Sequence, residues 1–467
     1  MSKNGYFKQY LGLGLGIVIM AAVIMMPAPE GLSLEAWRTL GIMLFAICIW
    51  VFDSFPIGIG SVLAMAMIYW LNIMPFETTL SQFMKTATWF VVASFAISCG
   101  LSCTPLAKRL LRALIRIAGT KTNMVILALM ITTALISTIM SNIPTTAMMM
   151  SVSFVILEGM GATPGKSRMG RVLMIGIPIA AMCGGIVTPA GSSVNVIGIE
   201  LLKSAGYNMT FFQWMIYGLP LCIILLPLGW ITLIKIFKPE EIPPEVIEKI
   251  KNPPDVPDKW DVREKKAAFI IVATLILWVA GSWIPVLDMT VVATMAMVVF
   301  FLPGVNVFTF KEFAASISWD AILTVGSVMA LANAVVSTGL SQWMVDRVFA
   351  DVAGWNPLLF LIFLAFFLNF VHLILPTAPS LCSILLPPMI AVAAIAGFSP
   401  LTMCFMVSCM AGCVMLLPVD TLTVMTYATG YYSIPQLFKA GLVNSCIWSL
   451  LMALWPYLVS VVFKWVV

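Results

Sequence analysis

Apolar segments of about 20 residues recur along the whole chain, and they constrain its fold more than any other feature. Of the 467 residues, 61% are hydrophobic and only 10% are charged. A water-soluble domain cannot bury that much apolar surface. The pattern therefore predicts an all-α polytopic protein of the lipid bilayer, with about eleven spanning segments.

The ends and the net charge of the chain fit this class. The first apolar run follows Lys3 and Lys8, and we interpret it as a retained first span (1–34) rather than a cleaved signal peptide. The net charge of +5 is small and does not form a clustered basic face, so nucleic-acid binding is not expected. The ten cysteines lie in apolar segments, which predicts neither a disulfide framework nor a Cys/His metal site.

Four apolar runs are too long for one helix and contain Pro, Gly or Ser near the middle. The runs 122–160 and 355–396 predict re-entrant hairpins, and 170–200 and 400–430 predict broken helices. Irregular backbone at membrane depth is tolerated only inside protein or along a cavity. These four interruptions therefore mark candidate binding elements.

The two halves of the chain resemble each other. A charged, proline-rich stretch at 238–266 separates 35–237 from 267–467, and we interpret it as a linker. Three blocks recur in the same order: "ATWFVVASF" with "ISWDAILTV", "SNIPTTAMM" with "LPTAPSLCS", and "CGGIVTPAGSS" with "GCVMLLPVDTL". Such internal repeats are typical of secondary transporters, whose sites lie where the repeats meet.

The basic residues predict a topology. With a cytoplasmic N-terminus and hairpins that enter from opposite sides, twenty of the 25 Lys and Arg are expected to face the cytoplasm, as the positive-inside rule expects. This makes the repeats inverted and places the protein in the cell (inner) membrane. The exceptions are Arg38, Lys85, Lys203, Arg347 and Lys464.

The first hairpin carries a cluster of small polar residues in "STIMSNIPTTAMMM". Ser137 and Ser141 share a helical face, Asn142 follows, and Pro144 frees backbone carbonyls. Hydroxyl, amide and carbonyl oxygens suit an alkali cation, and the hydroxyls and the amide also suit a carboxylate. Interhelical hydrogen bonding is the alternative. Because the cluster sits at a helix break and recurs in the second half, we favour a binding site.

The broken helix "GGIVTPAGSSVNVIG" begins its second part near Ser192, after Pro189 and Gly191. A helix start exposes amide N–H groups and a positive dipole end, which bind anions in transporters. The counterparts in the second half are Thr377, Ser380, Asp420, Thr421 and Thr423. No Lys or Arg lies in these motifs, so a bound cation is an attractive partner for an anion here.

With these motifs in order, the chain resembles the divalent anion/sodium symporter family, which carries dicarboxylates, citrate or sulfate. The resemblance runs from "GLSLEAWRTLGIML" through "SCGLSCTPLAKRL" to "LFKAGLVN". It implies an inverted-repeat homodimer with an elevator motion, and substrate and Na⁺ bound at the hairpin tips and broken helices.

Carried over to this chain, the resemblance implies a first Na⁺ site at Ser137, Ser141, Asn142 and Gly191. It also implies substrate contacts from Ser141, Asn142 and Ser192, with Thr377 and Thr421 as the corresponding positions of the second half.

The second half departs from the family pattern. Its Ser-Asn-Thr motif is replaced by Thr377-Ala378-Pro379, and a carboxylate appears at Asp420. We hypothesise that Asp420 replaces the lost ligands, either binding Na⁺ or carrying a proton. The alternative is that Asp420 caps the following helix. We expect the lone histidine, His372, to be packed rather than a ligand, and Asp53 and Asp320 to lie at the membrane interface.

The expected function is secondary active transport of small anions, first di- or tricarboxylates and then sulfate, with no cofactor other than a coupling ion. Na⁺ is the first expected coupling ion and H⁺ the second. An anion exchanger is the alternative. An intramembrane enzyme would need a nucleophile and base or paired acids, which one His and one mid-membrane Asp do not supply. A channel would show pore rings instead of a duplication with broken helices.

Overall fold

The computed structural model describes residues 3–253, 256–348, 355–375 and 377–463. Within these ranges the chain forms helices joined by loops and contains no strand, which confirms the all-α class. Lys464, one of the exceptions in the topology prediction, lies outside the described residues.

The first half and the linker contain the following helices: α1 (Lys3–Met25), α2 (Leu34–Val51), α3 (Ile57–Trp70), α4 (Phe76–Phe83), α5 (Thr86–Ser102), α6 (Leu106–Ala118), α7 (Thr122–Ser137), α8 (Asn142–Gly159), α9 (Arg168–Gly185), the short 3₁₀ turn η1 (Pro189–Gly191), α10 (Ser193–Ser204), α11 (Phe211–Phe237) and α12 (Pro244–Lys251). The second half contains α13 (Val262–Ala280), α14 (Met289–Phe301), α15 (Phe310–Ser316), α16 (Trp319–Ser337), α17 (Leu340–Val348), α18 (Pro357–Ile374), α19 (Ala378–Ile395), α20 (Pro400–Ala411), α21 (Thr421–Tyr427) and α22 (Ile434–Phe463).

Seven helical segments of the described chain are long and apolar enough to cross a membrane. They are 6–25, 34–51, 76–102, 211–237, 319–337, 357–374 and 434–463. Shorter apolar helices include α3, α7 and α20. The total of eleven spans stays a prediction.

The helices are interrupted where the sequence predicted. Residues 138–141 separate α7 from α8, and 375–377 separate α18 from α19. Both α9 and α20 end inside their apolar runs and resume as α10 and α21. The side chain of Thr188 caps η1 by accepting from the Gly191 amide, and the Asp420 carboxylate accepts from the Leu422 amide at the start of α21.

Each long helix supports the interruption of its own half. A methyl group added at Gly218 of α11 would lie 2.1 Å from the Ile186 carbonyl oxygen, just after α9. One added at Gly441 of α22 would lie 1.9 Å from the Met415 carbonyl oxygen, just after α20. Only glycine permits these approaches. The two glycines therefore let α11 and α22 lie directly against the irregular backbone.

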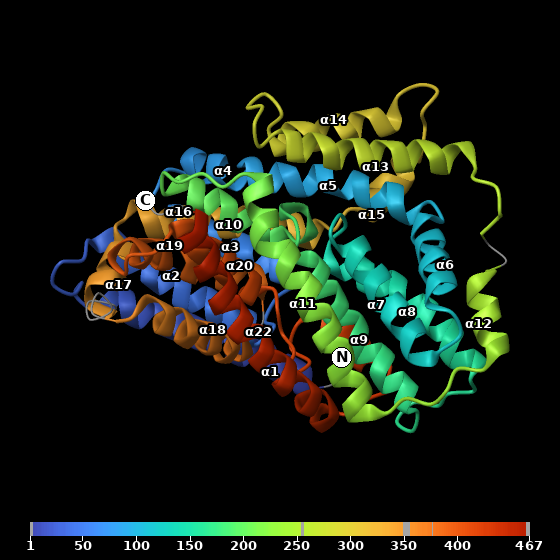
Figure 1. Ribbon diagram of the computed structural model, residues 1–467. Coiled ribbons are helices and arrows are strands. Elements are labelled where there is room, and N and C mark those ends of the chain that lie inside the picture. Colours follow the sequence, from blue (N-terminus) through green and yellow to red (C-terminus); the bar gives the residue numbers. More distant parts are fainter. Residues whose placement is uncertain (1–2, 254–255, 349–354, 376, 464–467) are drawn as a thin grey trace.

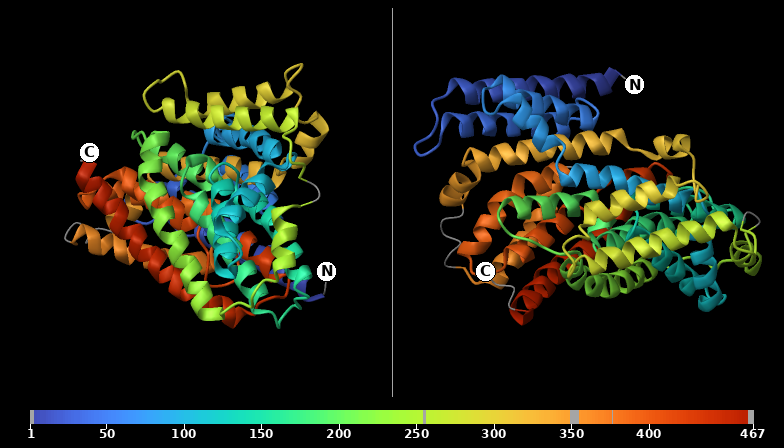
Figure 2. Two further views of the ribbon diagram at one scale, coloured as in Figure 1. Left: turned by 45° about the vertical axis from the view of Figure 1, so that its right-hand side comes forward. Right: turned by 90° about the horizontal axis from the view of Figure 1, so that it is seen from above.

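The remaining helices form two flanking groups. In Figure 1, α13 and α14 run side by side along one edge of the molecule, against α5. In Figure 2, the N-terminal helices α1, α2 and α3 lie together at another side. Helix α16 packs on α3 and also on α19. The interrupted elements α7–α10 and α18–α21 lie between these groups and the long helices α11 and α22.

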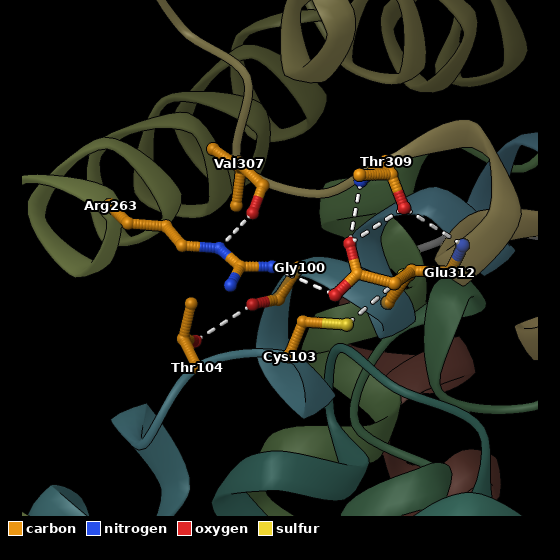
Figure 3. A network of polar contacts seen from close by, with 8 residues as sticks. Gly100, Cys103, Thr104, Arg263, Val307, Thr309 and Glu312 are labelled. Carbon is orange, nitrogen blue, oxygen red and sulfur yellow. Dashed lines mark hydrogen bonds and ion pairs between the residues drawn. The ribbon is translucent and has the colours of Figure 1, made fainter.

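A polar network connects the start of α13 with the residues before and within α15, next to the end of α5 (Figure 3). Arg263 donates to the Val307 carbonyl and pairs with Glu312 at 3.4 Å. Hydrogen bonds from the Thr309 amide and hydroxyl hold the pKa of Glu312 below its usual value. Cys103, at the end of α5, lies beside Glu312.

The stretch 238–266 connects the halves and packs against other parts of the protein. Within it, α12 buries Val246, Ile247 and Ile250, and Val246 packs on Gly159 of α8. After α12, Asp258 pairs with Arg112 of α6 at 2.6 Å. The linker therefore packs across α6 and α8 before α13 begins.

A buried ion pair fixes the end of the linker, where α13 begins. Arg109 of α6 lies 2.8 Å from Glu264 of α13, with side chains only 9% and 4% exposed. The Arg109 guanidinium also lies 5.1 Å from the Trp260 ring and donates to the Lys259 carbonyl.

We predict that Arg109→Gln lowers the free energy of unfolding by about 3 kcal/mol, because it leaves the Glu264 carboxylate buried without its partner. The measurement is chemical or thermal unfolding of the purified protein. Lys8→Gln is the matched control. It breaks an ion pair with Asp53 whose side chains are 52% and 66% exposed, and exposed pairs contribute about 0–1 kcal/mol. Equal losses for the two variants would contradict the role given to burial.

Candidate functional site

The four interruptions meet at one cavity of about 190 Å³. The tip between α7 and α8 contributes Ser141 and Asn142, and the start of α10 contributes Ser192. The second half contributes Thr377 from the α18–α19 tip and Asp420 from the start of α21. Thr421 also lines the cavity, so every residue predicted to contact substrate lies on its wall.

The predicted first cation position lies directly behind this wall. The buried Ser137 hydroxyl donates to Asn142 Oδ1 at 2.6 Å. A methyl group added at Gly191 would lie 2.6 Å from the Gly185 carbonyl oxygen and 2.8 Å from that of Ser137. The structure thus brings the side-chain oxygens of Ser137 and Asn142 and the carbonyls of Gly185 and Ser137 together around Gly191. Hydroxyl, amide and carbonyl oxygens are the groups that hold Na⁺ at broken helices.

A buried amide orients this cluster. Asn195 of α10 donates to the carbonyls of Gly185 at 2.7 Å and Thr188 at 2.9 Å. The Thr188 hydroxyl donates in turn to the Thr138 carbonyl at 2.5 Å. These bonds tie the α9–α10 break to the α7–α8 tip. Sequence reasoning did not assign this role to Asn195, although an asparagine in an apolar helix was a usable signal.

The second half builds its wall differently. The buried Thr377 hydroxyl donates to the Ser380 hydroxyl at 2.5 Å, and Ala378 and Pro379 follow it on the cavity surface. Asp420 Oδ2 accepts from the Leu422 amide at 3.1 Å, so the carboxylate does cap α21. The same carboxylate lines the cavity. Capping and contact with a ligand are therefore compatible here.

His372 is packed, as expected. It is 1% exposed, and its Nε2 donates to the Ala411 carbonyl at 2.5 Å, where α20 ends. This satisfies one of the carbonyls that a helix end leaves without a partner. His372 does not line the cavity but lies within electrostatic range of Asp420.

The opposite wall comes from the loop between α2 and α3, the start of α3, and α16, and it was not predicted. Asp53, Asp320 and Thr324 line the cavity there. The fold brings both acids to the cavity, and their expected position at the membrane interface stays a prediction. Asp53 pairs with Lys8 at 3.1 Å, and Asp320 accepts from the Gly58 amide at 2.8 Å. The buried Thr324 hydroxyl has no hydrogen-bond partner in the described part of the chain.

At the cavity, helix N-termini without side-chain caps meet a wall that has no basic side chain among its described residues. Helices α8, α10 and α19 begin at it, and the residues before them (Ser141, Ser192 and Thr377) make no side-chain cap. Their first-turn amides are oriented for an anion. Among the described residues on the wall there is no Lys, Arg or His, whereas three are Asp.

The comparisons with known proteins decide the family. The model of the sodium:sulfate symporter transmembrane region matches residues 8–465. The chain belongs to this family. Among curated relatives, the sodium-dependent dicarboxylate transporter SdcS of Staphylococcus saprophyticus is 24% identical, with 94% of this chain and 89% of the relative covered. SdcS of Staphylococcus aureus is 23% identical, with 93% and 88% covered. The chain is thus a multi-pass membrane transporter and not an enzyme.

Solved structures support the fold. The YdaH transporter of Alcanivorax borkumensis superimposes with a TM-score of 0.55 over 99% of this chain and 98% of its own, at 12% identity. MtrF of Neisseria gonorrhoeae, described as belonging to a class of antimetabolite efflux pumps, gives 0.51 over 97% and 94%, also at 12% identity. At this identity the similarity concerns the fold alone.

We predict that Gly191→Ala abolishes Na⁺-dependent stabilisation of the protein, because the added methyl group would enter the space between the Gly185 and Ser137 carbonyls. The measurement is the rise in melting temperature on adding Na⁺ in place of choline. Gly14→Ala is the control, since a methyl group there has no neighbour within 4 Å. Retention of the full Na⁺ response in Gly191→Ala would remove Gly191 from the cation position.

Proposed function

We propose that this protein is a cation-coupled secondary transporter of small carboxylate anions. Na⁺ is the first coupling ion and H⁺ the second. The observation that carries the proposal is the cavity itself, where uncapped helix starts face a wall without a basic side chain. The sodium-dependent dicarboxylate transporters among the relatives make dicarboxylates the first substrates to test.

Charge balance explains the need for a cation. A carboxylate that leaves water for a site inside a membrane protein loses several kcal/mol of hydration unless another charge compensates it. Helix dipoles and hydroxyls supply only part of that compensation. Because the described wall residues include three Asp and no cation, a bound Na⁺ or proton must supply the rest.

The proposed arrangement assigns a role to each predicted residue. Na⁺ binds behind the first wall, between Ser137, Ser141, Asn142 and Gly191. The substrate carboxylate lies over Ser141, Asn142 and Ser192, at the starts of α8 and α10. Thr377 and Thr421 contact the substrate from the second half, and Asp420 meets a second cation or proton.

The position of the cavity supports an elevator motion. The interrupted elements α7–α10 and α18–α21 supply one side of it, and α3 and α16 supply the other. Movement of the first group along the second would carry the site across the membrane. We propose inverted repeats at 35–237 and 267–467, a cytoplasmic N-terminus in the cell (inner) membrane, and a homodimer.

Two alternatives share this site. An anion exchanger would need no net cation movement, because a substrate would occupy the site in both directions. A sulfate transporter would use the same uncapped helix starts. Both predict transport behaviour that differs from Na⁺-driven carboxylate uptake.

In proteoliposomes of the purified protein, we predict that an inward Na⁺ gradient drives accumulation of labelled succinate or citrate. Asn142→Ala should raise the half-saturating Na⁺ concentration about tenfold, which corresponds to the loss of about 1.4 kcal/mol. Asn123→Ala is the control, because that residue lies at the start of α7, away from the cavity.

The outcomes separate the alternatives. Uptake driven by external acid alone would favour H⁺ coupling. Uptake that requires only unlabelled substrate inside would favour exchange, and uptake of sulfate but no carboxylate would favour the sulfate transporter. Unchanged Na⁺ dependence in Asn142→Ala would contradict the assignment of the first cation position.

A further inference from the structure

We propose that an anionic phospholipid binds in a pocket between α6, α8 and α12. Its phosphate lies at Lys108 and Lys249, and one of its acyl chains lies along the apolar part of the pocket. This site is separate from the cavity at the helix breaks and shares no lining residue with it. The inference therefore does not depend on which anion the protein transports.

The first step is the size and position of the pocket. Its volume of about 550 Å³ is larger than the 190 Å³ of the cavity at the helix breaks, and it lies within the range of about 300–1,000 Å³ that is usual for ligand sites. Three elements line it: α6 with Lys108 and Leu111, α8 with Ser151, Val152 and Val155, and the linker with Lys249, Ile250 and Pro253.

The second step is the division of the lining into a basic part and an apolar part. Lys108 and Lys249 form the basic part, and the described lining contains no acidic side chain. The apolar part consists of Leu111, Val152, Val155, Ile250 and Pro253. An amphiphile with an anionic head contacts both parts at once. Free phosphate would contact only the basic part, so the lining favours an anionic lipid over a free anion.

The third step is the capacity of the two lysines to hold a phosphate. A lysine ammonium has three N–H donors, so Lys108 can bind a phosphate oxygen and also keep a partner within the protein. Lys249 lies in the last turn of α12 and is exposed. A zwitterionic phosphatidylcholine would bring its own cation close to these two ammonium groups. The pair therefore favours a head group with a net negative charge.

The surroundings of the pocket resemble those of a membrane surface. Helix α6 follows the candidate span 76–102 and carries four basic residues and no acidic one. Its last turn leaves Ile117 83% exposed, and Val155 of α8 is 49% exposed. Basic side chains next to exposed apolar ones are typical of a helix at the surface of an anionic bilayer. Such a position gives a membrane lipid access to the pocket.

Contacts on both sides hold α12 in place over the pocket. Arg112 of α6 donates to the Asn252 side chain at 3.0 Å, just after α12 ends. On the other side, Val246 of α12 packs on Gly159 of α8. The pocket is therefore formed by the fold itself, and a lipid does not have to create it. Preformed sites bind with a smaller loss of conformational entropy.

The experiment compares two lipids with the same acyl chains. Purified full-length protein, freed of lipid in detergent, is titrated with dioleoylphosphatidylglycerol or with dioleoylphosphatidylcholine. Native mass spectrometry measures the fraction of protein that retains one lipid. We expect phosphatidylglycerol to bind about tenfold more tightly than phosphatidylcholine. In the double variant Lys108→Gln/Lys249→Gln this preference should disappear, because the two ammonium groups are removed. Inorganic phosphate should not displace the lipid.

Two further variants keep the test decisive. Val155→Trp fills the apolar part with a larger side chain at a half-exposed position and leaves both charges in place. It should weaken the binding of phosphatidylglycerol about tenfold, and it replaces the double variant if that variant does not fold. Lys265→Gln/Lys311→Gln is the matched control. It removes the same amount of charge at two exposed lysines outside the pocket and should keep the wild-type preference.

Four results would overturn this inference. They are equal binding of the two lipids by the wild type, binding that neither the double variant nor Val155→Trp changes, an equal loss of preference in the control variant, and displacement of the lipid by inorganic phosphate. The third would assign the preference to overall charge, and the fourth would make the pocket a site for the free anion. The proposed transport function would stand in each case, because uptake into proteoliposomes tests it separately.

Discussion

A helix inside a membrane can be interrupted only where other groups satisfy the exposed backbone, and this requirement organises the structure. Each half of the chain meets it with a long helix that carries a glycine at the critical point. Gly218 of α11 lies against the Ile186 carbonyl, and Gly441 of α22 lies against that of Met415. Asn195 and His372 then bind carbonyls that the breaks leave open. The irregular segments are held firmly, and their helix starts remain directed at the cavity.

The second constraint is electrostatic. A site for anions inside a membrane protein needs positive charge, yet the described wall of this cavity has no basic side chain. In the proposed function, uncapped helix starts attract the anion and oxygen clusters hold the compensating cation. The two halves supply these elements unequally. The first half places an oxygen cluster around Asn142 at its break, whereas the second half places the carboxylate of Asp420 at its own.

Much of the site could be predicted from the sequence because its elements carry local signals. Pro, Gly and Ser inside apolar runs marked the breaks, and the polar residues beside them line one cavity, from Ser141 to Thr421. The opposite wall could not be predicted, because Asp53 and Asp320 reach the same cavity only through the packing of α3 and the loop before it against α16. The packing of the linker was also missed, since proline and charge concealed the apolar face of α12. Its contact with α8 depends on Gly159, far away in the sequence.

The most direct test of this account is the dependence of substrate affinity on the cation. Calorimetry would measure the binding of succinate over a series of Na⁺ concentrations, with choline keeping the ionic strength constant. If a cation compensates the charge of the anion, affinity rises steeply with Na⁺ and choline cannot replace it. An affinity that is the same in Na⁺ and in choline, at every pH tested, would show that the cavity binds anions without a cation. That result would contradict the account.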